Sequence, residues 1–182
     1  MKIVSLKNYS NTSYYFGSFF KRSSWYFVSL LFIHTMIPFP SRFKVGILKL
    51  FGAKIGKNVR IKPNVQIKYP WKLEIGNDVW IGEGTWIDNL AIVRIGDNIC
   101  ISQNAYLLTG NHNYKSEYFE LMIKEIIIEN GVWIGAKSVV CPGVICKSHC
   151  VLSVGSIATS NMEPYGIYQG NPAIFKMKRN IR

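Results

Sequence analysis

Apolar residues recur at every sixth position through most of the chain, from Ile55 to Leu152. A period of six matches neither the helical period nor the simple alternation of an exposed strand, and it fits a short strand followed by a corner, repeated many times. The first position of each unit is aliphatic, with one exception at Cys146. These first positions are Ile55, Ile61, Ile67, Ile75, Ile81, Ile87, Ile95, Ile101, Leu107, Ile128, Ile134, Val140, Cys146 and Leu152.

The second and fifth positions of the unit are also restricted. The fifth position holds mostly small or β-branched residues, as at Val59, Thr85 and Ala105, and the second often holds glycine, as at Gly76 and Gly96. We predict that these glycines give a sharp corner the backbone freedom that it needs. One short strand cannot bury its apolar face alone, so successive coils must stack with strand ladders between them, about 4.8 Å apart. The pattern therefore predicts a parallel β-helix whose first positions fill a central column.

Three insertions interrupt the repeat, each after three units. Two of them add two residues each, and the third adds fifteen residues between Leu107 and Ile128. Three strands therefore make one triangular coil, and all three insertions leave from the same corner. We expect an all-β fold with about five triangular coils over residues 51–160 and a long loop over residues 110–127. A basic and aromatic N-terminal segment, residues 1–50, and a short C-terminal tail, residues 161–182, would flank the coils.

The net charge of +12 is concentrated in the N-terminal part, where residues 1–72 hold thirteen Lys or Arg residues and no acid. The apolar stretch from Trp25 to Ile37 is shorter than the roughly 20 residues that span a bilayer. We expect this segment to be partly helical, and either to lie on an anionic membrane surface or to pack on the protein itself or another subunit. The expected location is cytoplasmic, with peripheral contact at the inner face of the cytoplasmic membrane. Nucleic-acid binding is not expected, because the chain has no recognised motif for it.

The cysteines are few and show no CxxC spacing, so neither a disulfide framework nor a metal site is expected. They are Cys100, Cys141, Cys146 and Cys150. Cys146 is at a first position and Cys150 at a fifth, so both should point into the core as small apolar side chains.

His112 is the histidine whose position is best suited to chemistry. The repeat register places Leu108 over Asp88 and Thr109 over Asn89, and His112 follows just past the interrupted corner. Long insertions on repeat scaffolds commonly carry function. His34 lies outside the repeats and His149 is at an outward fourth position, so neither has a comparable setting.

A family resemblance rests on four sequence stretches: LKLFGAKIG, WIGEGTWIDNL, LLTGNHNY and GNPA. With these stretches, residues 45–177 resemble the hexapeptide-repeat acyltransferases, and most closely the O-acetyltransferases of capsule, colanic-acid and other exopolysaccharide biosynthesis. The resemblance implies a left-handed β-helix, a homotrimer with active sites between subunits, acetyl-CoA as co-substrate and a sugar or glycan acceptor. Hexapeptide repeats alone indicate only the fold. The combination of TGNH with GNPA is more specific.

The resemblance also implies roles for individual residues. His112 would act as general base on an acceptor hydroxyl, a role that suits imidazole because its unperturbed pKa is about 6.5. Asp88 would contact the acceptor, with Asn89 beside it. The positions that would bind CoA are Ala136, Val154, Thr159, Ser160, Gly170, Asn171, Pro172, Ala173, Lys176 and Arg179.

Alternatives remain open at this level. Asp88 could be only a corner residue, because Asp is a common turn former. The basic tail could be merely solvated. The protein could instead acetylate the amine of an amino-sugar nucleotide, or be a non-catalytic scaffold associated with a membrane. Trp80, Trp86 and Trp133 are at outward sixth positions, which favours their burial by a partner subunit or by the N-terminal segment.

Overall fold

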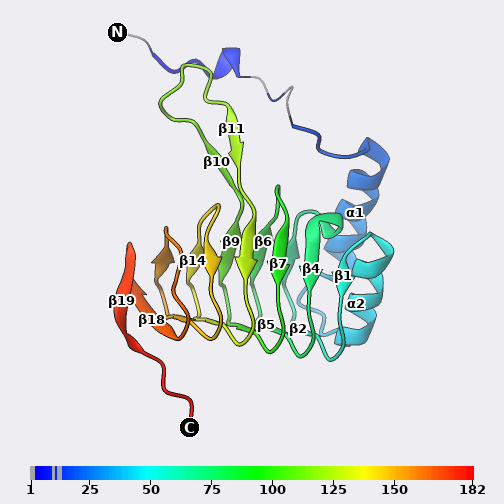
Figure 1. Cartoon of the computed structure of the whole chain (residues 1–182). Coiled ribbons are helices and arrows are strands. Elements are labelled where there is room, and N and C mark those ends of the chain that lie inside the picture. The colour runs from blue at the N-terminus through cyan, green and yellow to red at the C-terminus, as the bar shows by residue number, and fades with distance from the viewer. Residues whose placement is uncertain (1–2, 10, 12–13) are drawn as a thin grey trace.

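The computed structural model describes residues 3–9, 11 and 14–182, and it is a left-handed parallel β-helix with a triangular cross-section. Three sheets form its sides, and their strands pair in parallel except for the last two strands of the second sheet (Figure 1). The first sheet contains β1 (Lys54–Ile55), β4 (Leu73–Ile75), β7 (Val93–Ile95), β12 (Ile126–Ile128) and β15 (Ile145–Cys146). The second contains β2 (Arg60–Ile61), β5 (Trp80–Ile81), β8 (Cys100–Ile101), β13 (Trp133–Ile134), β16 (Val151–Leu152), β18 (Gly166–Gly170) and β19 (Ala173–Lys178). The third contains β3 (Gln66–Ile67), β6 (Trp86–Asp88), β9 (Tyr106–Leu108), β14 (Val139–Val140) and β17 (Ile157–Ala158).

The strand register confirms the predicted stacking of first positions. Ile55 pairs with Ile75, and Ile75 in turn pairs with Ile95. All the first-position side chains are buried in one core. Cys146 and Cys150 are both inside it, as predicted. The coil count is slightly higher than expected, because β18 pairs with β16 and begins a sixth coil beyond the five complete ones.

The second-position glycines have a different role from the predicted one. Positive φ angles occur two residues later, for example at Asp78 (57°) and Asn98 (57°), and not at Gly76 or Gly96. A β carbon on Gly76 would lie only 2.7 Å from the carbonyl group of Gly96 in the next coil. The turn-freedom interpretation is therefore wrong for these positions. Glycine is needed there because stacked coils approach each other too closely for a side chain.

We expect Gly76→Ala to lower stability by about 2 kcal/mol, the usual cost of forcing an extra carbon into a packed interior. The midpoint of chemical denaturation, followed by circular dichroism, measures this effect. Gly46→Ala is the matched control, because a β carbon there meets no atom within 4 Å. Gly46 is inside a helix, so this change should raise stability by about 0.5–1 kcal/mol. Equal midpoints for Gly76→Ala and the wild type would contradict the close-approach explanation.

The N-terminal segment contributes two helices, α1 (Phe19–Phe32) and α2 (Ser41–Leu50), which cover the first-coil end of the β-helix (Figure 1). Trp25 is buried, and its indole N–H donates to the carbonyl of Ile67 at 2.9 Å. Leu48 of α2 joins the same core. The segment thus packs on the protein's own body, one of the two predicted arrangements. No helix in the described part of the chain is long and apolar enough to cross a bilayer.

The other elements are short. Two 3-10 turns are present, η1 (Leu6–Asn8) near the N-terminus and η2 (Pro70–Lys72) before β4. The predicted long loop begins as an antiparallel hairpin, β10 (Gly110–His112) and β11 (Leu121–Ile123), which projects away from the coils (Figure 1). The extreme N-terminal segment crosses the outer end of this hairpin, where Ser5 N–H donates to Glu117 O at 3.0 Å.

Candidate active site

The candidate site is at the corner where the third sheet ends and the chain turns towards the first sheet. Asp88 at the end of β6 pairs with Leu108 of β9, as the repeat register predicted. The hairpin leaves the coils two residues later, and His112 pairs with Leu121 across it. The same corner therefore presents Asp88 and gives rise to the hairpin that carries His112 (Figure 1).

His112 is held in a defined orientation by the hairpin. Its Nδ1 lies 2.9 Å from the carbonyl oxygen of Phe119, and its ring stacks on the Phe119 ring at 4.5 Å with an interplanar angle of 2°. The Tyr9 ring lies 5.7 Å away on the N-terminal segment. A carbonyl oxygen can only accept a hydrogen bond, so Nδ1 of the neutral ring must carry the proton. Nε2 then keeps the lone pair that a general base requires.

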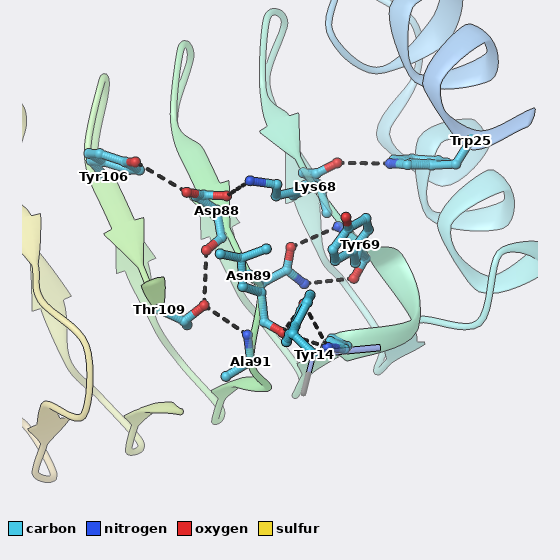
Figure 2. A network of polar contacts seen from close by, with 12 residues as sticks. Tyr14, Trp25, Lys68, Tyr69, Asp88, Asn89, Ala91, Tyr106 and Thr109 are labelled. Carbon is cyan, nitrogen blue, oxygen red and sulfur yellow. Dashed lines mark hydrogen bonds and ion pairs between the residues drawn. The ribbon is translucent and has the colours of Figure 1, made fainter. Parts of the chain in front are cut away.

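Asp88 is surrounded by donors but retains capacity for another hydrogen bond (Figure 2). Lys68 Nζ lies 2.8 Å from Oδ1, and the Tyr106 hydroxyl donates to Oδ2 at 3.4 Å. The ion pair with Lys68 satisfies the buried Oδ1, whereas the Tyr106 contact with Oδ2 is long. A carboxylate oxygen can accept more than one hydrogen bond, so Oδ2 is the oxygen suited to accept a ligand hydroxyl.

Tyr106 remains a hydrogen-bond donor at neutral pH. Burial raises the pKa of Tyr106 to about 12, and the neighbouring charge of Asp88 adds to the rise. The Tyr106 ring also stacks on Trp86, with centroids 4.6 Å apart and planes 10° apart. Trp86 therefore forms an aromatic surface next to the carboxylate.

Asn89 and Thr109 brace the corner. Asn89 is fully buried, and its side-chain amide donates to Tyr69 O at 2.6 Å and accepts from Tyr69 N–H at 2.9 Å. The Thr109 hydroxyl donates to Asp88 O at 3.0 Å and accepts from Ala91 N–H at 2.9 Å. In this arrangement the Asn89 amide is turned towards the backbone of the preceding coil. Its contact with an acceptor stays a prediction.

The N-terminal segment is fastened to the same corner by Tyr14. The Tyr14 hydroxyl donates to Leu90 O at 2.6 Å, and Lys72 Nζ donates to the same oxygen at 2.5 Å and to the Tyr14 hydroxyl at 3.0 Å. Burial is the main reason that the pKa of Tyr14 is raised well above its ordinary value, with smaller contributions from Tyr69 and Asp88. Burial also lowers the pKa of Lys72.

Sequence reasoning missed three residues of this site, namely Lys68, Tyr106 and Tyr14. Lys68 precedes Asp88 by one coil of twenty residues, so the register used for Leu108 could also have found it. Tyr106 likewise pairs with Trp86 in that register. Tyr14 lies outside the repeats, and no sequence pattern indicates where it docks.

Part of the predicted CoA-binding set gathers at a different corner, between the second and third sheets. Gly155, next to Val154, donates its N–H to Ala136 O at 2.9 Å, and Gly170 N–H donates to Ser156 Oγ at 3.0 Å. Asn171, Pro172 and Ala173 follow Gly170 in the turn before β19. Thr159 and Ser160 instead follow β17, towards the first sheet. One chain therefore does not bring all the predicted residues together.

The two tail cations of that set differ in their surroundings. Lys176 is exposed on β19. Arg179 is half-buried, and its guanidinium donates to Gly131 O at 2.9 Å and to His149 O at 3.2 Å. Through these hydrogen bonds Arg179 holds the C-terminal tail against the coils. Binding of CoA by either residue stays a prediction.

The described residues contain no group of three or more His, Cys, Asp or Glu side chains placed to hold a metal ion. All four cysteines are free. Hydrogen bonding with Cys150 and burial raise the pKa of the Cys146 thiol, which keeps it neutral in the core.

Comparisons with known proteins agree with this architecture. WcaF of Escherichia coli strain K12, a protein assigned to acetyl transfer in colanic acid biosynthesis, is 37% identical over 138 residues, which cover 76% of each chain. Galactoside O-acetyltransferase of the same strain is 32% identical over 130 residues, 70% of this chain and 64% of that one. A solved galactoside acetyltransferase in complex with coenzyme A superimposes with a TM-score of 0.78 at 26% identity, covering 88% of this chain and 81% of that chain. No family model matches the chain.

Stacked hexapeptide coils of this kind form the fold of the left-handed β-helix acyltransferases. The structure of the hexapeptide-repeat acetyltransferase VCA0836 from Vibrio cholerae has the same fold, with a TM-score of 0.80, 21% identity and coverage of 88% of this chain and 92% of that one. With the identity to WcaF across three quarters of both chains, the protein belongs to the hexapeptide-repeat acetyltransferases.

Proposed function

We propose that the protein is an acetyl-CoA-dependent O-acetyltransferase that modifies a sugar hydroxyl during glycan biosynthesis, with His112 as the general base. The observation that carries the proposal is the hydrogen bond from His112 Nδ1 to Phe119 O, which leaves Nε2 free to accept a proton. Family membership supports the acetyl transfer, and the relatives named for colanic acid and galactoside acetylation support a sugar acceptor.

In the proposed reaction, one proton moves from the acceptor hydroxyl to His112 and then from His112 to the sulfur of CoA. His112 Nε2 takes the proton of the acceptor hydroxyl, and the oxygen attacks the carbonyl carbon of the acetyl thioester that acetyl-CoA supplies. The new C–O bond forms and the C–S bond breaks. The proton on His112 then returns to the leaving sulfur. Asp88 would accept a hydrogen bond from another acceptor hydroxyl at Oδ2, and Lys68 and Tyr106 would hold the carboxylate in place.

We further propose active sites between subunits of a homotrimer. Ala136 and Val154 lie at the corner between the second and third sheets, whereas Asp88 lies at the next corner. A site that uses both corners is completed most simply by a neighbouring copy. Trp80 and Trp133, which are 52% and 47% exposed on the second sheet, would be covered there. Sedimentation equilibrium should give three times the mass of 20.8 kDa, and a monomer would contradict this arrangement.

Peripheral membrane contact through α1 is also part of the proposal. Tyr26, Phe27 and Leu31 are exposed on this helix, and Lys21 is close to its start. Apolar and basic side chains on one helix favour binding to an anionic bilayer surface. Flotation with anionic liposomes at low salt tests the contact, and absence of the protein from the lipid fraction would contradict it.

Release of CoA thiol, measured with a panel of sugar hydroxyl and amino-sugar acceptors, tests the function itself. We expect thiol release with hydroxyl acceptors and an acetyl ester in the product. Transfer restricted to amines would show N-acetylation instead. No transfer to any acceptor, together with no binding of acetyl-CoA, would support a non-catalytic scaffold.

Phe119 should act as a positioning residue for His112. Its φ of 48° is in the left-handed region, which glycine adopts freely, so Phe119→Gly removes the stacked ring without adding backbone strain. We expect kcat to fall by roughly tenfold or more, because small losses of catalytic geometry are costly, while the KM for acetyl-CoA stays unchanged. Phe119→Tyr keeps an aromatic ring at this position and should therefore have the wild-type kcat. Tyr118→Ala, which removes the neighbouring exposed ring, is the control and should also have the wild-type kcat. Unchanged kcat in Phe119→Gly would refute the positioning role.

A further inference from the structure

A cavity of about 690 Å³ lies between α1 and the third sheet, next to the proposed acceptor site. Arg22, Trp25 and Tyr26 of α1 form one wall, and Lys68, Tyr69 and Trp86 of the coils form the other. Figure 2 shows α1 and Trp25 close to Lys68, whose ammonium pairs with Asp88. The cavity is therefore lined by the lysine that pairs with the carboxylate we assign to acceptor binding.

The lining of the cavity is cationic and aromatic. Arg22, His34 and Lys68 line it, and no Asp or Glu does. Among the described residues, no ion pair reaches Arg22, and its Nε is buried without a hydrogen-bond partner. The guanidinium carbon lies 5.7 Å from the Phe16 ring centroid, so an aromatic face packs against it. A guanidinium with no paired carboxylate favours an anion in the cavity that it lines.

The start of α1 adds to this positive potential. The first turn of the helix has no acidic residue, and Ser18 before it makes no side-chain capping hydrogen bond. Lys21 and Arg22 thus lie at the positive end of the helix dipole, where an anion would be stabilising. No residue of this turn supplies that anion.

The aromatic walls connect the cavity to the acceptor site. Trp86 lines the cavity and stacks on Tyr106, whose hydroxyl donates to Asp88. A sugar bound at Asp88 would therefore leave its attached group facing Trp86 and Arg22. Guanidinium groups pair well with phosphate oxygens because several N–H donors match them at once.

We propose that this cavity binds the phosphate of a phosphate-linked acceptor, so that the sugar is presented as a glycosyl phosphate or diphosphate and Arg22 pairs with the phosphate oxygens. The proposal rests on the proposed function, because it assigns the acceptor class of that same site. The carrier beyond the phosphate is either a nucleoside or a lipid, and both share the chemistry that Arg22 recognises.

Calorimetric titration tests the anion site without catalysis. The probes are inorganic pyrophosphate, uridine diphosphate and farnesyl diphosphate, each titrated into the full-length protein. We expect binding of the diphosphates, with a rise in Kd of roughly tenfold or more in Arg22→Gln, the usual effect of losing one charge-assisted hydrogen bond. Arg42→Gln is the matched control, because Arg42 is exposed on α2 and does not line the cavity. Absence of binding, or equal Kd values in Arg22→Gln and the wild type, would overturn the proposal.

Acetyl transfer to one sugar in three forms tests the link to function. Galactose would be presented as methyl galactoside, as UDP-galactose and as a farnesyl-diphosphate galactoside. We expect kcat/KM to be at least roughly tenfold higher for one diphosphate form, and Arg22→Gln to remove that advantage while leaving methyl galactoside unaffected. The favoured form identifies the carrier. Equal kcat/KM for all three forms would refute a phosphate-linked acceptor. Failure of the proposed function would look different, since no form would be acetylated while Arg22-dependent diphosphate binding persisted.

Discussion

Replacing His112 with alanine should reduce acetyl transfer by roughly 100-fold to 10,000-fold, the range expected for loss of a general base. The effect should be on kcat, because in the proposed mechanism His112 Nε2 acts on the reacting hydroxyl and does not bind the acyl donor. The fold should survive, since the side chain is half-buried on a projecting hairpin and outside the core. Thiol release from acetyl-CoA with the true acceptor measures the loss, and circular dichroism checks the fold.

His149→Asn is the control for this experiment. His149 has a φ of 61°, a conformation that asparagine also tolerates, and its ring stacks on Tyr165 at the far end of the coils. The acetyl-transfer activity of the His149→Asn protein should equal that of the wild type. A His112→Ala protein that transfers acetyl groups at the wild-type rate would remove the proposed mechanism, and the base would have to be sought elsewhere.

Replacing Asp88 with asparagine should lower kcat/KM for the acceptor by roughly 10-fold to 100-fold, with little change in the KM for acetyl-CoA. The amide keeps the shape of the carboxylate but removes its charge, and with it the ion pair to Lys68 at 2.8 Å. A hydroxyl that donates to a charged oxygen is bound more tightly than one that donates to a neutral amide. Initial rates measured against varied acceptor concentration, at saturating acetyl-CoA, give the effect.

Asp78→Asn provides the matched control. Asp78 has a φ of 57°, which asparagine tolerates, and its carboxylate accepts a hydrogen bond from Asn58 at 2.9 Å on an exposed corner remote from Lys68. We expect no change in kcat/KM. If Asp88→Asn matched this control, Asp88 would be only a corner residue, which is the alternative that the sequence left open.

The sequence predicted most of the fold because the hexapeptide pattern repeats one physical requirement many times. Each aliphatic first position has to be buried, and each coil can bury it only by stacking, so the register of Asp88 against Leu108 follows from counting residues. The coil count was one partial coil short because β18 lies outside the aliphatic pattern that ends at Leu152. The role of the second-position glycines was also misjudged, since the distance from Gly76 to Gly96 depends on the neighbouring coil.

For the candidate site, the sequence identified only some of the side chains, and the structure decided how they are oriented. Position after the interrupted corner was enough to select His112, but its tautomer follows from a hydrogen bond to Phe119, seven residues away on the same hairpin. Asn89 was predicted beside Asp88, yet its amide is directed at the backbone of Tyr69. Adjacent residues on a strand point in opposite directions, and the corner backbone determines which one faces outwards.

The sequence by itself determined the triangular β-helix, its buried column and the corner that carries His112, because these depend on local periodicity that every coil repeats. Only the tertiary structure decided how the N-terminal segment packs on the coils near the corner of Asp88. Tyr14 and Trp25 reach the coils through hydrogen bonds to residues 76 and 42 positions away, and no local pattern encodes such contacts. Their positions depend on how α1 packs against the finished coils, and so does the cavity beside Asp88.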